Sequence, residues 1–216
     1  MRHIRKKSAP TKFRQYVKSI GADFDEMDAD VKTELRNSLI AEQKGICAYC
    51  QQVLKDGQIK IEHHCERSIC NGANGTMDRR LDYTNLLAVC KGNEGRPEHE
   101  LHCDSRKACF NANNGLPIAI NPTQAAHIRT ISYSSTGKIT SNNEQYDREI
   151  NEILNLNLDY LKDNRQKKWN LFYRLSNRGN KDKMRKLLEA DLATKNGKFT
   201  KQFAGLSEYM LNRFCR

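Results

Sequence analysis

A pair of cysteines separated by two residues constrains this sequence more than any other feature. The spacing in Cys47-Ala48-Tyr49-Cys50 allows two thiolates on one tight turn to reach a single tetrahedral ion at about 2.3 Å. Such an ion needs two more ligands. The best candidates are Cys90, which ends an apolar run, and Cys103, which follows a charged loop. We therefore predict a structural zinc site formed by Cys47, Cys50, Cys90 and Cys103.

The fourth zinc ligand has alternatives. Twelve residues separate Cys90 from Cys103, so the second pair is not a tight knuckle, and Cys109, His99 and His102 remain substitutes for Cys103. Four protein ligands leave no open position for water or substrate on the zinc. Any catalysis would therefore use another ion.

The other cysteines carry no such pattern. The chain has eight in all and begins without a secretory signal, which favours metal binding over a disulfide framework, because cytosolic thiols are kept reduced. Cys65, Cys70 and Cys215 lack knuckle spacing, so we expect each to be a small buried hydrophobe or an idle thiol.

Charge favours a polyanionic partner. The formal net charge is +11, and residues 1–20 hold seven lysines or arginines and no acid. Residues 162–186, which include Arg178, hold ten against two acids. A charge run is often only a solvated surface, but two dense basic segments in one small chain indicate binding to a nucleic-acid backbone by counterion release.

A carboxylate lies beside a histidine at the end of a predicted strand. In residues 58–64, Ile59 and Ile61 alternate with polar residues, as in a short half-buried strand, which then reaches Glu62 and His63. This order can place Glu62 on a metal while the imidazole of His63 activates water, the two roles that phosphodiester hydrolysis requires.

Several motifs in a fixed order resemble a known family. The order is Cys47-x2-Cys50, Ile61-Glu62-His63, Tyr83-Thr84-Asn85-Leu86-Leu87, Cys90 and Cys103-Asp104-Ser105-Arg106-Lys107. This series resembles HNH endonucleases with a zinc-bound ββα-metal (His-Me finger) fold, and is most similar to the PtuB-type nucleases of Septu and retron-associated antiphage systems. The resemblance covers about residues 40–122.

The resemblance implies a role for each matching residue. His63 would be the general base, with His64 as the alternative, and Asn85 would pin the loop after the histidine strand. Glu62 and Asp104 would hold a catalytic Mg²⁺ or Mn²⁺, since carboxylates suit hard ions, and His102 is the alternative to Asp104. The expected phosphate contacts are Arg67, Arg106 and Lys107.

The resemblance also implies an activity and partners. The expected activity is hydrolysis of phosphodiester bonds in DNA, or in RNA such as tRNA, as the effector of an antiphage complex. The expected partners are a PtuA-type ATPase and, in retron-associated systems, a reverse transcriptase with its DNA. The alternative is a noncatalytic zinc module that binds nucleic acid. No apolar run is long enough to span a membrane, so we expect a cytoplasmic protein.

The sequence predicts an α+β organisation in three parts. Residues 1–46 are expected to form a basic helical extension, because Val31, Leu35 and Leu39 recur every four residues and Gly45 ends the pattern. Residues 47–122 form the zinc-stapled module. Residues 123–216 form a C-terminal helical region, with a hairpin or loop near 132–137 and a break at Asn196-Gly197.

Overall fold

The computed structural model describes residues 1–73, 75, 77–114, 117–176, 180–199 and 201–215, without the side chains of residues 111–114; Arg178 lies outside this set. The helices are α1 (Thr11–Tyr16), α2 (Ala29–Glu42), η1 (Tyr83–Asn85), η2 (Glu98–Glu100), α3 (Cys103–Asn114), α4 (Ala125–Arg129), α5 (Glu144–Arg148), the π-helix η3 (Glu149–Ile153), α6 (Asp159–Leu175), α7 (Lys181–Leu192) and α8 (Ala204–Phe214). The strands are β1 (Ile59–His63), β2 (Leu86–Cys90), β3 (Ile131–Tyr133), β4 (Ile139–Ser141), β5 (Thr194–Lys195) and β6 (Lys198–Phe199).

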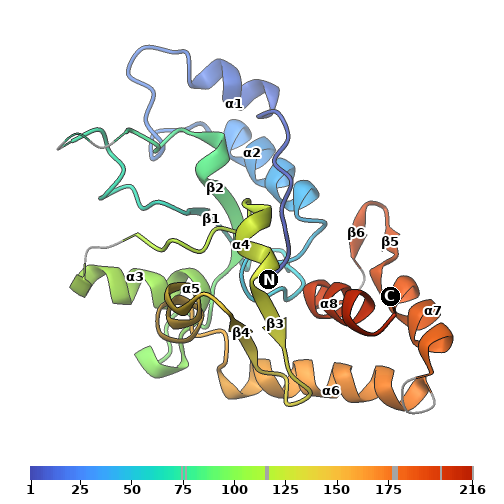
Figure 1. Cartoon of the computed structure of the whole chain (residues 1–216). Helices are drawn as coiled ribbons and strands as arrows, with labels where there is room; N and C mark the ends of the chain where they lie inside the picture. Colours follow the sequence, from blue (N-terminus) through green and yellow to red (C-terminus); the bar gives the residue numbers. More distant parts are fainter. Residues whose placement is uncertain (74, 76, 115–116, 177–179, 200, 216) are drawn as a thin grey trace.

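The predicted α+β class is confirmed. Within the described residues the strands form three separate antiparallel pairs, β1–β2, β3–β4 and β5–β6. The β1–β2 pair lies at the centre, with α1 and α2 on one side and α3 on the other (Figure 1). Its register sets His63 opposite Leu86 and Ile59 opposite Cys90.

Strand β2 is buried on both faces, which explains its unbroken apolar sequence. Leu86 and Ala88 pack with α2, whereas Leu87 and Val89 enter the larger core that contains the cysteine cluster. Successive side chains of a strand point to opposite faces, so a strand covered on both sides reads as a continuous apolar run rather than an alternating one.

The helix predicted around residues 31–39 is confirmed as α2. It buries Val31, Leu35 and Leu39, and Gly45 follows it with a φ of +78°. At its end the Gln43 side chain clamps β2: its amide nitrogen donates to Ala88 O over 2.6 Å, and its oxygen accepts from Ala88 N over 2.8 Å. This clamp fixes the distance between α2 and β2.

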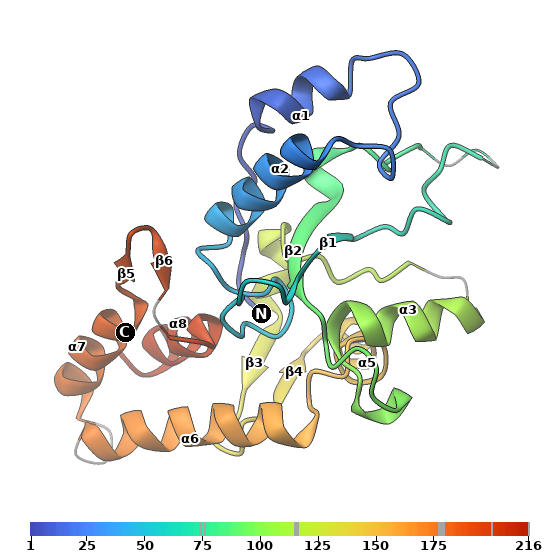
Figure 2. The same ribbon diagram turned by 180° about the vertical axis from the view of Figure 1, so that it is seen from behind.

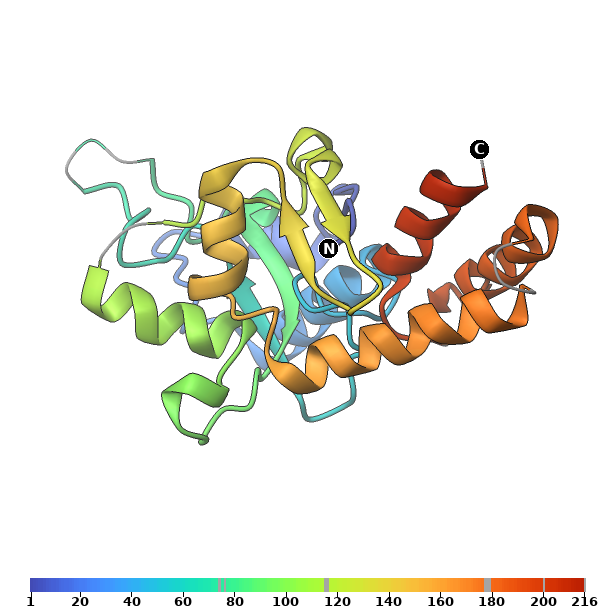
Figure 3. The ribbon, with the colours of Figure 1, turned by 60° about the horizontal axis from the view of Figure 1, so that its bottom comes forward.

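The C-terminal region is largely helical, as predicted. Helix α6 runs along the base of the molecule, and α7 and α8 pack together near one of its ends (Figure 3). The predicted turn near 132–137 is the β3–β4 hairpin, and the Asn196-Gly197 break is the turn between β5 and β6. The short helices α4, α5 and η3 were not among the predicted elements.

The three predicted parts of the chain share one core. One buried cluster contains residues from all three parts: Met1 and Ile4 from the first, Leu87 from the second and Leu206 from the third. The terminal segments therefore complete the core around the central strands. No described helix combines the length and apolar character of a membrane span.

Candidate functional site

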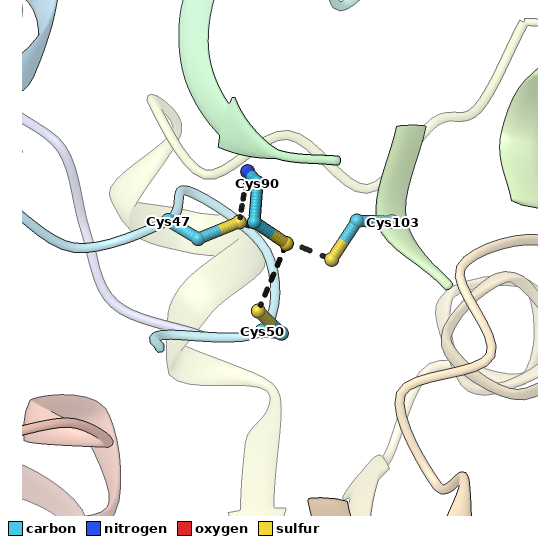
Figure 4. A group of neighbouring side chains, drawn as sticks. All are labelled: Cys47, Cys50, Cys90 and Cys103. Atoms are coloured by element: carbon cyan, nitrogen blue, oxygen red, sulfur yellow. Dashed lines mark hydrogen bonds between the residues drawn. The ribbon is translucent and has the colours of Figure 1, made fainter. Parts of the chain in front are cut away.

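Four cysteines gather on one side of the central strand pair. Their sulfur atoms all lie within 4.8 Å of one another, and the side chains of Cys47, Cys50, Cys90 and Cys103 point toward a common centre (Figure 4). The Cys47–Cys103 and Cys50–Cys90 sulfur distances are 3.9 Å and 3.6 Å. Tetrahedral zinc with bonds of about 2.3 Å requires sulfur atoms about 3.8 Å apart. The predicted grouping is therefore confirmed, with dimensions that fit a structural zinc ion.

The local structure explains why the first pair converges. The knuckle closes through Cys47 N donating to Gln52 O over 2.9 Å and Gln51 N donating to Cys47 O over 3.2 Å. Gln51 adopts a left-handed conformation with a φ of +67°, which turns the chain tightly after Cys50. Both thiols are buried.

Hydrogen bonds within the cluster favour thiolate at Cys47. Burial by itself would raise the pKa of Cys47, but hydrogen bonds from the other three thiols outweigh it and lower the pKa well below its ordinary value. The amide of Cys90 also approaches the Cys47 sulfur, at 3.4 Å. Thiolate is the form that binds zinc, and Cys47 is the member of the cluster held in that form, whereas burial raises the pKa of Cys50 and of Cys103.

The alternative ligands lie outside the sulfur cluster. His102 contacts Cys103 Sγ through Nδ1 at 3.1 Å, and its Nε2 bonds to the Tyr160 hydroxyl. Since a zinc-bound thiolate only accepts, Nδ1 donates to the sulfur and Nε2 accepts from tyrosine, an outer-shell arrangement that orients a ligand. His99 is exposed, and Cys109 belongs to no described cluster.

A glycine brings the second cysteine pair together across its long loop. His102 N donates to Gly92 O over 3.1 Å, and a Cβ added at Gly92 would lie only 1.9 Å from His102 O. The loop after Cys90 thus folds back so closely that Cys103 reaches the cluster. Two sequence-distant ligands meet because the backbone at residue 92 carries no side chain.

Replacing Gly92 by alanine is expected to destabilise the fold by more than about 2 kcal/mol and weaken zinc retention, because the new Cβ overlaps backbone and the φ of +57° is left-handed. Gly95→Ala is the matched control: its φ is +86°, and nothing lies within 4 Å of the added Cβ. Thermal unfolding and zinc content should change at position 92 far more than at position 95. Equal effects would contradict this account of the loop.

A second group of polar side chains lines an open pocket between β1, the following loop and α3. The pocket has a volume of about 570 Å³, and its lining includes Glu62, His63, Glu66, Arg67 and Asp104. We call it the carboxylate pocket. Three residues from the sequence-based hypothesis, Glu62, His63 and Asp104, meet here although Asp104 is more than forty residues from the other two.

Glu62 and Asp104, two of the carboxylates that line the pocket, lie close together in a region of low solvent exposure. Burial raises the pKa of Glu62 well above its ordinary value, and the adjacent Asp104 raises it further, whereas Lys107 opposes the shift. Asp104 is also 3.3 Å from Lys60. Two neighbouring carboxylates favour a bound cation or a shared proton, and oxygen donors of this kind suit Mg²⁺ or Mn²⁺.

Lys107 is not the exposed phosphate contact that the sequence suggested. Its side chain is 1% exposed, and its ammonium group forms an ion pair with Glu62 and donates to His63 O over 2.8 Å. Glu66 lies 3.6 Å away. The reason is helical geometry: Lys107 follows Asp104 by three residues on α3, so both face β1. The three-residue spacing can be read from the sequence, but the sequence does not show which face of the helix is buried.

His63 is oriented with one ring nitrogen facing a carbonyl. Its Nε2 lies 2.9 Å from Arg80 O, so this nitrogen carries the proton and donates, which leaves Nδ1 as an acceptor. Phe24 packs edge-on against the ring, with centroids 4.5 Å apart. Burial lowers the pKa of His63 to about 4, so the imidazole is neutral near pH 7. A neutral, oriented imidazole can accept a proton from water.

The neighbouring histidine is placed differently. His64 is buried, its Nε2 lies 3.0 Å from Ile120 O, and it is absent from the lining of the carboxylate pocket. The two imidazoles lie in different surroundings, because His63 ends β1 at the pocket whereas His64 follows the strand and faces Ile120 O. Of the two candidate bases, only His63 reaches the pocket.

Asn85 holds the loop that follows His64. Its side-chain oxygen accepts from Cys65 N over 2.8 Å, and its nitrogen donates to Cys65 O over 2.9 Å and to Arg79 O over 3.1 Å. The residue is 1% exposed. It therefore acts on the backbone of the pocket and does not line the pocket itself.

Replacing Asn85 by alanine is expected to destabilise the protein by about 2–4 kcal/mol, because buried groups of Cys65 lose their partners. Chemical denaturation measures this loss. The half-buried Asn71, whose side chain donates to Ser68 O over 3.3 Å and accepts from Ala73 N over 2.9 Å, is the control, and Asn71→Ala should cost less, about 1 kcal/mol. A similar small effect at Asn85 would refute the pinning role.

The two arginines proposed as phosphate contacts differ in position. Arg67 lines the carboxylate pocket and pairs with Asp25 over 2.6 Å, at 43% side-chain exposure. Arg106 pairs with Glu98 and donates to Glu152 O over 3.1 Å, and it does not line the pocket. Arg67 is thus the better placed of the two.

Two cysteines outside the cluster require a correction. Cys65 and Cys70 form a disulfide with a Cα–Cα distance of 6.0 Å, so they are neither idle thiols nor simple hydrophobes. The bridge closes the short loop that carries Glu66 and Arg67 into the carboxylate pocket. The sequence signal for this pair is weak: the two cysteines lie five residues apart in the loop after the histidine strand and lack knuckle spacing.

Comparison with known proteins adds no relative: no family model matches this chain, and no curated protein matches it.

Proposed function

We propose that this protein is a metal-dependent endonuclease of the HNH type, in which β1, β2 and α3 form a zinc-stapled ββα-metal module. The observation that carries the proposal is the carboxylate pocket, where Glu62, His63 and Asp104 line one open cavity beside a four-cysteine cluster. The order of the elements, strand, strand and helix, matches the order of the motifs in the sequence.

Each residue of the pocket has a different role in the proposed hydrolysis. Arg80 O holds Nε2–H of His63, and Nδ1 takes a proton from the water that attacks the phosphorus atom. A divalent ion bound by Glu62 and Asp104 would neutralise the charge that develops on the phosphate. Arg67 offers its guanidinium to a phosphate oxygen from the rim of the pocket. With RNA, His63 could instead deprotonate the 2′ hydroxyl and leave a cyclic phosphate.

Lys107 has a supporting role in this proposal. Its buried ammonium compensates one of the two negative charges at Glu62 and Asp104, and its bond to His63 O fixes the end of β1. Lys107 therefore opposes the rise in the pKa of Glu62 that burial and Asp104 cause.

The biological setting of the proposal follows the resemblance to PtuB-type nucleases. The proposed role is antiphage defence in the cytoplasm. The proposed partners are a PtuA-type ATPase and, in retron-associated systems, a reverse transcriptase with its DNA. The substrate is DNA or an RNA such as tRNA. The net charge of +11 is compatible with either polyanion.

The test is to incubate the purified protein, with and without the ATPase, with DNA and total RNA in Mg²⁺ and to map the cut ends. Cleavage that requires the divalent ion supports the proposal, and the ends identify the substrate and the chemistry. Binding of nucleic acid without cleavage under every condition would favour a noncatalytic zinc module instead.

A further inference from the structure

A second polar cavity lies away from the carboxylate pocket. It has a volume of about 630 Å³ and is lined by residues from the N-terminal segment, the end of α2 and the β5–β6 hairpin. We call it the basic groove, and its charged rim consists of Arg5, Lys7, Lys44 and Lys198. The hairpin and α3 lie on opposite sides of the β1–β2 pair in two views (Figures 1 and 2). The groove is therefore separate from the proposed catalytic residues.

Some cations of the N-terminal segment face the groove, and others point into the protein. Met1 and Ile4 are buried, and Ile4 N donates to Pro122 O over 2.8 Å, which fixes the segment along the core. Lys6 points inward, where its ammonium group pairs with Glu42 over 2.9 Å. Arg5 and Lys7, on either side of Lys6, are exposed and line the groove.

The opposite wall is held in place by an aromatic anchor. Phe199 of β6 is 4% exposed, and its amide donates to Lys44 O over 2.9 Å. Lys198 lies beside Gly45, where an added Cβ would be 3.3 Å from the lysine side chain. The packing of the hairpin against the end of α2 therefore brings Lys198 next to Lys44.

The positive charge of the groove is not balanced by acids. Glu42 is the one acidic residue in its lining, and it already receives the ammonium of Lys6 and the amide of Lys7. Within the described part of the chain, no ion pair is formed by Arg5, Lys7, Lys44 or Lys198. Cations that lie close together without acidic partners repel one another, and a bound polyanion relieves that repulsion.

We propose that the basic groove binds the phosphate backbone of a nucleic acid, as a contact region distinct from the carboxylate pocket. Most residues that line the groove are polar or charged, and four of them are the cations of its rim. Exposed lysines act as point charges and make sequence-independent phosphate contacts. The inference extends the proposed nuclease function, because it adds a place where substrate is held away from the scissile bond.

The experiment uses the full-length protein with His63→Ala, so that binding is measured without cleavage. The groove variant combines Arg5→Gln, Lys7→Gln, Lys44→Gln and Lys198→Gln. The matched control removes the same charge from exposed residues outside residues 1–20 and 162–186, by Lys55→Gln, Arg96→Gln, Arg129→Gln and Lys138→Gln. Fluorescence anisotropy with labelled DNA and RNA oligonucleotides, between about 50 and 200 mM salt, gives the affinity and its salt slope.

We expect the groove variant to bind about tenfold more weakly or worse, with a salt slope for duplex DNA reduced by up to about 3.6, since each of the four phosphate contacts contributes about 0.9. The control should keep most of the affinity. Equal loss in both variants, or no loss in the groove variant, would overturn the inference. Binding of polyglutamate in place of DNA and RNA would overturn it too and assign the groove to an acidic protein.

The outcomes also separate this inference from the proposed function. If the protein without the His63 substitution cleaves nucleic acid but the groove variant binds normally, the inference alone fails. If it does not cleave but binding depends on the groove, the nuclease proposal fails and the inference stands. Unfolding temperature and zinc content, measured for every variant, show whether a loss reflects misfolding.

Discussion

Replacing His63 by alanine is expected to lower the rate of nucleic-acid cleavage by about 10²–10⁴-fold, the usual contribution of a positioned general base. The structure gives the reason: Arg80 O fixes the Nε2 proton, so Nδ1 is the basic atom available to water in the carboxylate pocket. Initial rates in Mg²⁺ measure the effect.

The control for this prediction is a second histidine. His99→Ala changes an imidazole that is 82% exposed and outside both the cysteine cluster and the carboxylate pocket, and it should leave the rate unchanged. Zinc content and nucleic-acid affinity should be preserved in both variants. A His63→Ala protein that still cleaves at the original rate would remove the imidazole from the mechanism.

Replacing Cys47 by serine is expected to abolish zinc binding and most of the folding stability. Structural zinc contributes on the order of 10 kcal/mol in small zinc modules, which is comparable with the whole stability of a typical domain, about 5–15 kcal/mol. Cys47 is fully buried and bonded to the other thiols, so one lost ligand disrupts the packing of Cys90 and Cys103 at the ends of β2 and α3. Metal analysis and thermal unfolding measure the two effects.

The matched substitution is Cys109→Ser, at a half-buried thiol on α3 outside the cluster. It should retain one zinc ion per chain and change the unfolding temperature little. A strong chelator should unfold the wild-type protein to the same extent as Cys47→Ser. A zinc-free Cys47→Ser protein that unfolds at the wild-type temperature would show that the cluster does not hold the fold together.

The local sequence pattern was sufficient to predict an element when the apolar spacing that marks it lies within that element. The four-residue recurrence of Val31, Leu35 and Leu39 predicted α2 because one face of that helix meets the core. The short helices α4 and α5 have no buried residues of their own, so no apolar stripe marked them. In η3 the informative residue is Glu149, which is 2% exposed and accepts hydrogen bonds from Ala119 N and Ile120 N. The same segment also buries Ile150 and Ile153, but it is only five residues long, too short for a recurring pattern.

The carboxylate pocket was only partly accessible from sequence. Glu62, His63, Asn85 and Asp104 were identified as candidates by motif order, and the structure shows which of them share a cavity. The motif could not separate His63 from His64, since both follow Glu62, but the structure places only His63 in the lining of the pocket, while His64 faces Ile120 O. Likewise, it could not reveal that Lys107 is buried against Glu62.

The sequence by itself determined the elements whose cause is local: the C-x2-C knuckle, the continuous apolar strand β2 and the periodic helices. Tertiary structure alone decided how distant segments meet. It placed Cys103 with Cys90 through the glycine at position 92, turned Lys107 inward and set Lys198 beside Lys44. The physical reason is that spacing within one helix or strand fixes which residues share a face, whereas the partner of that face depends on the packing of the whole chain.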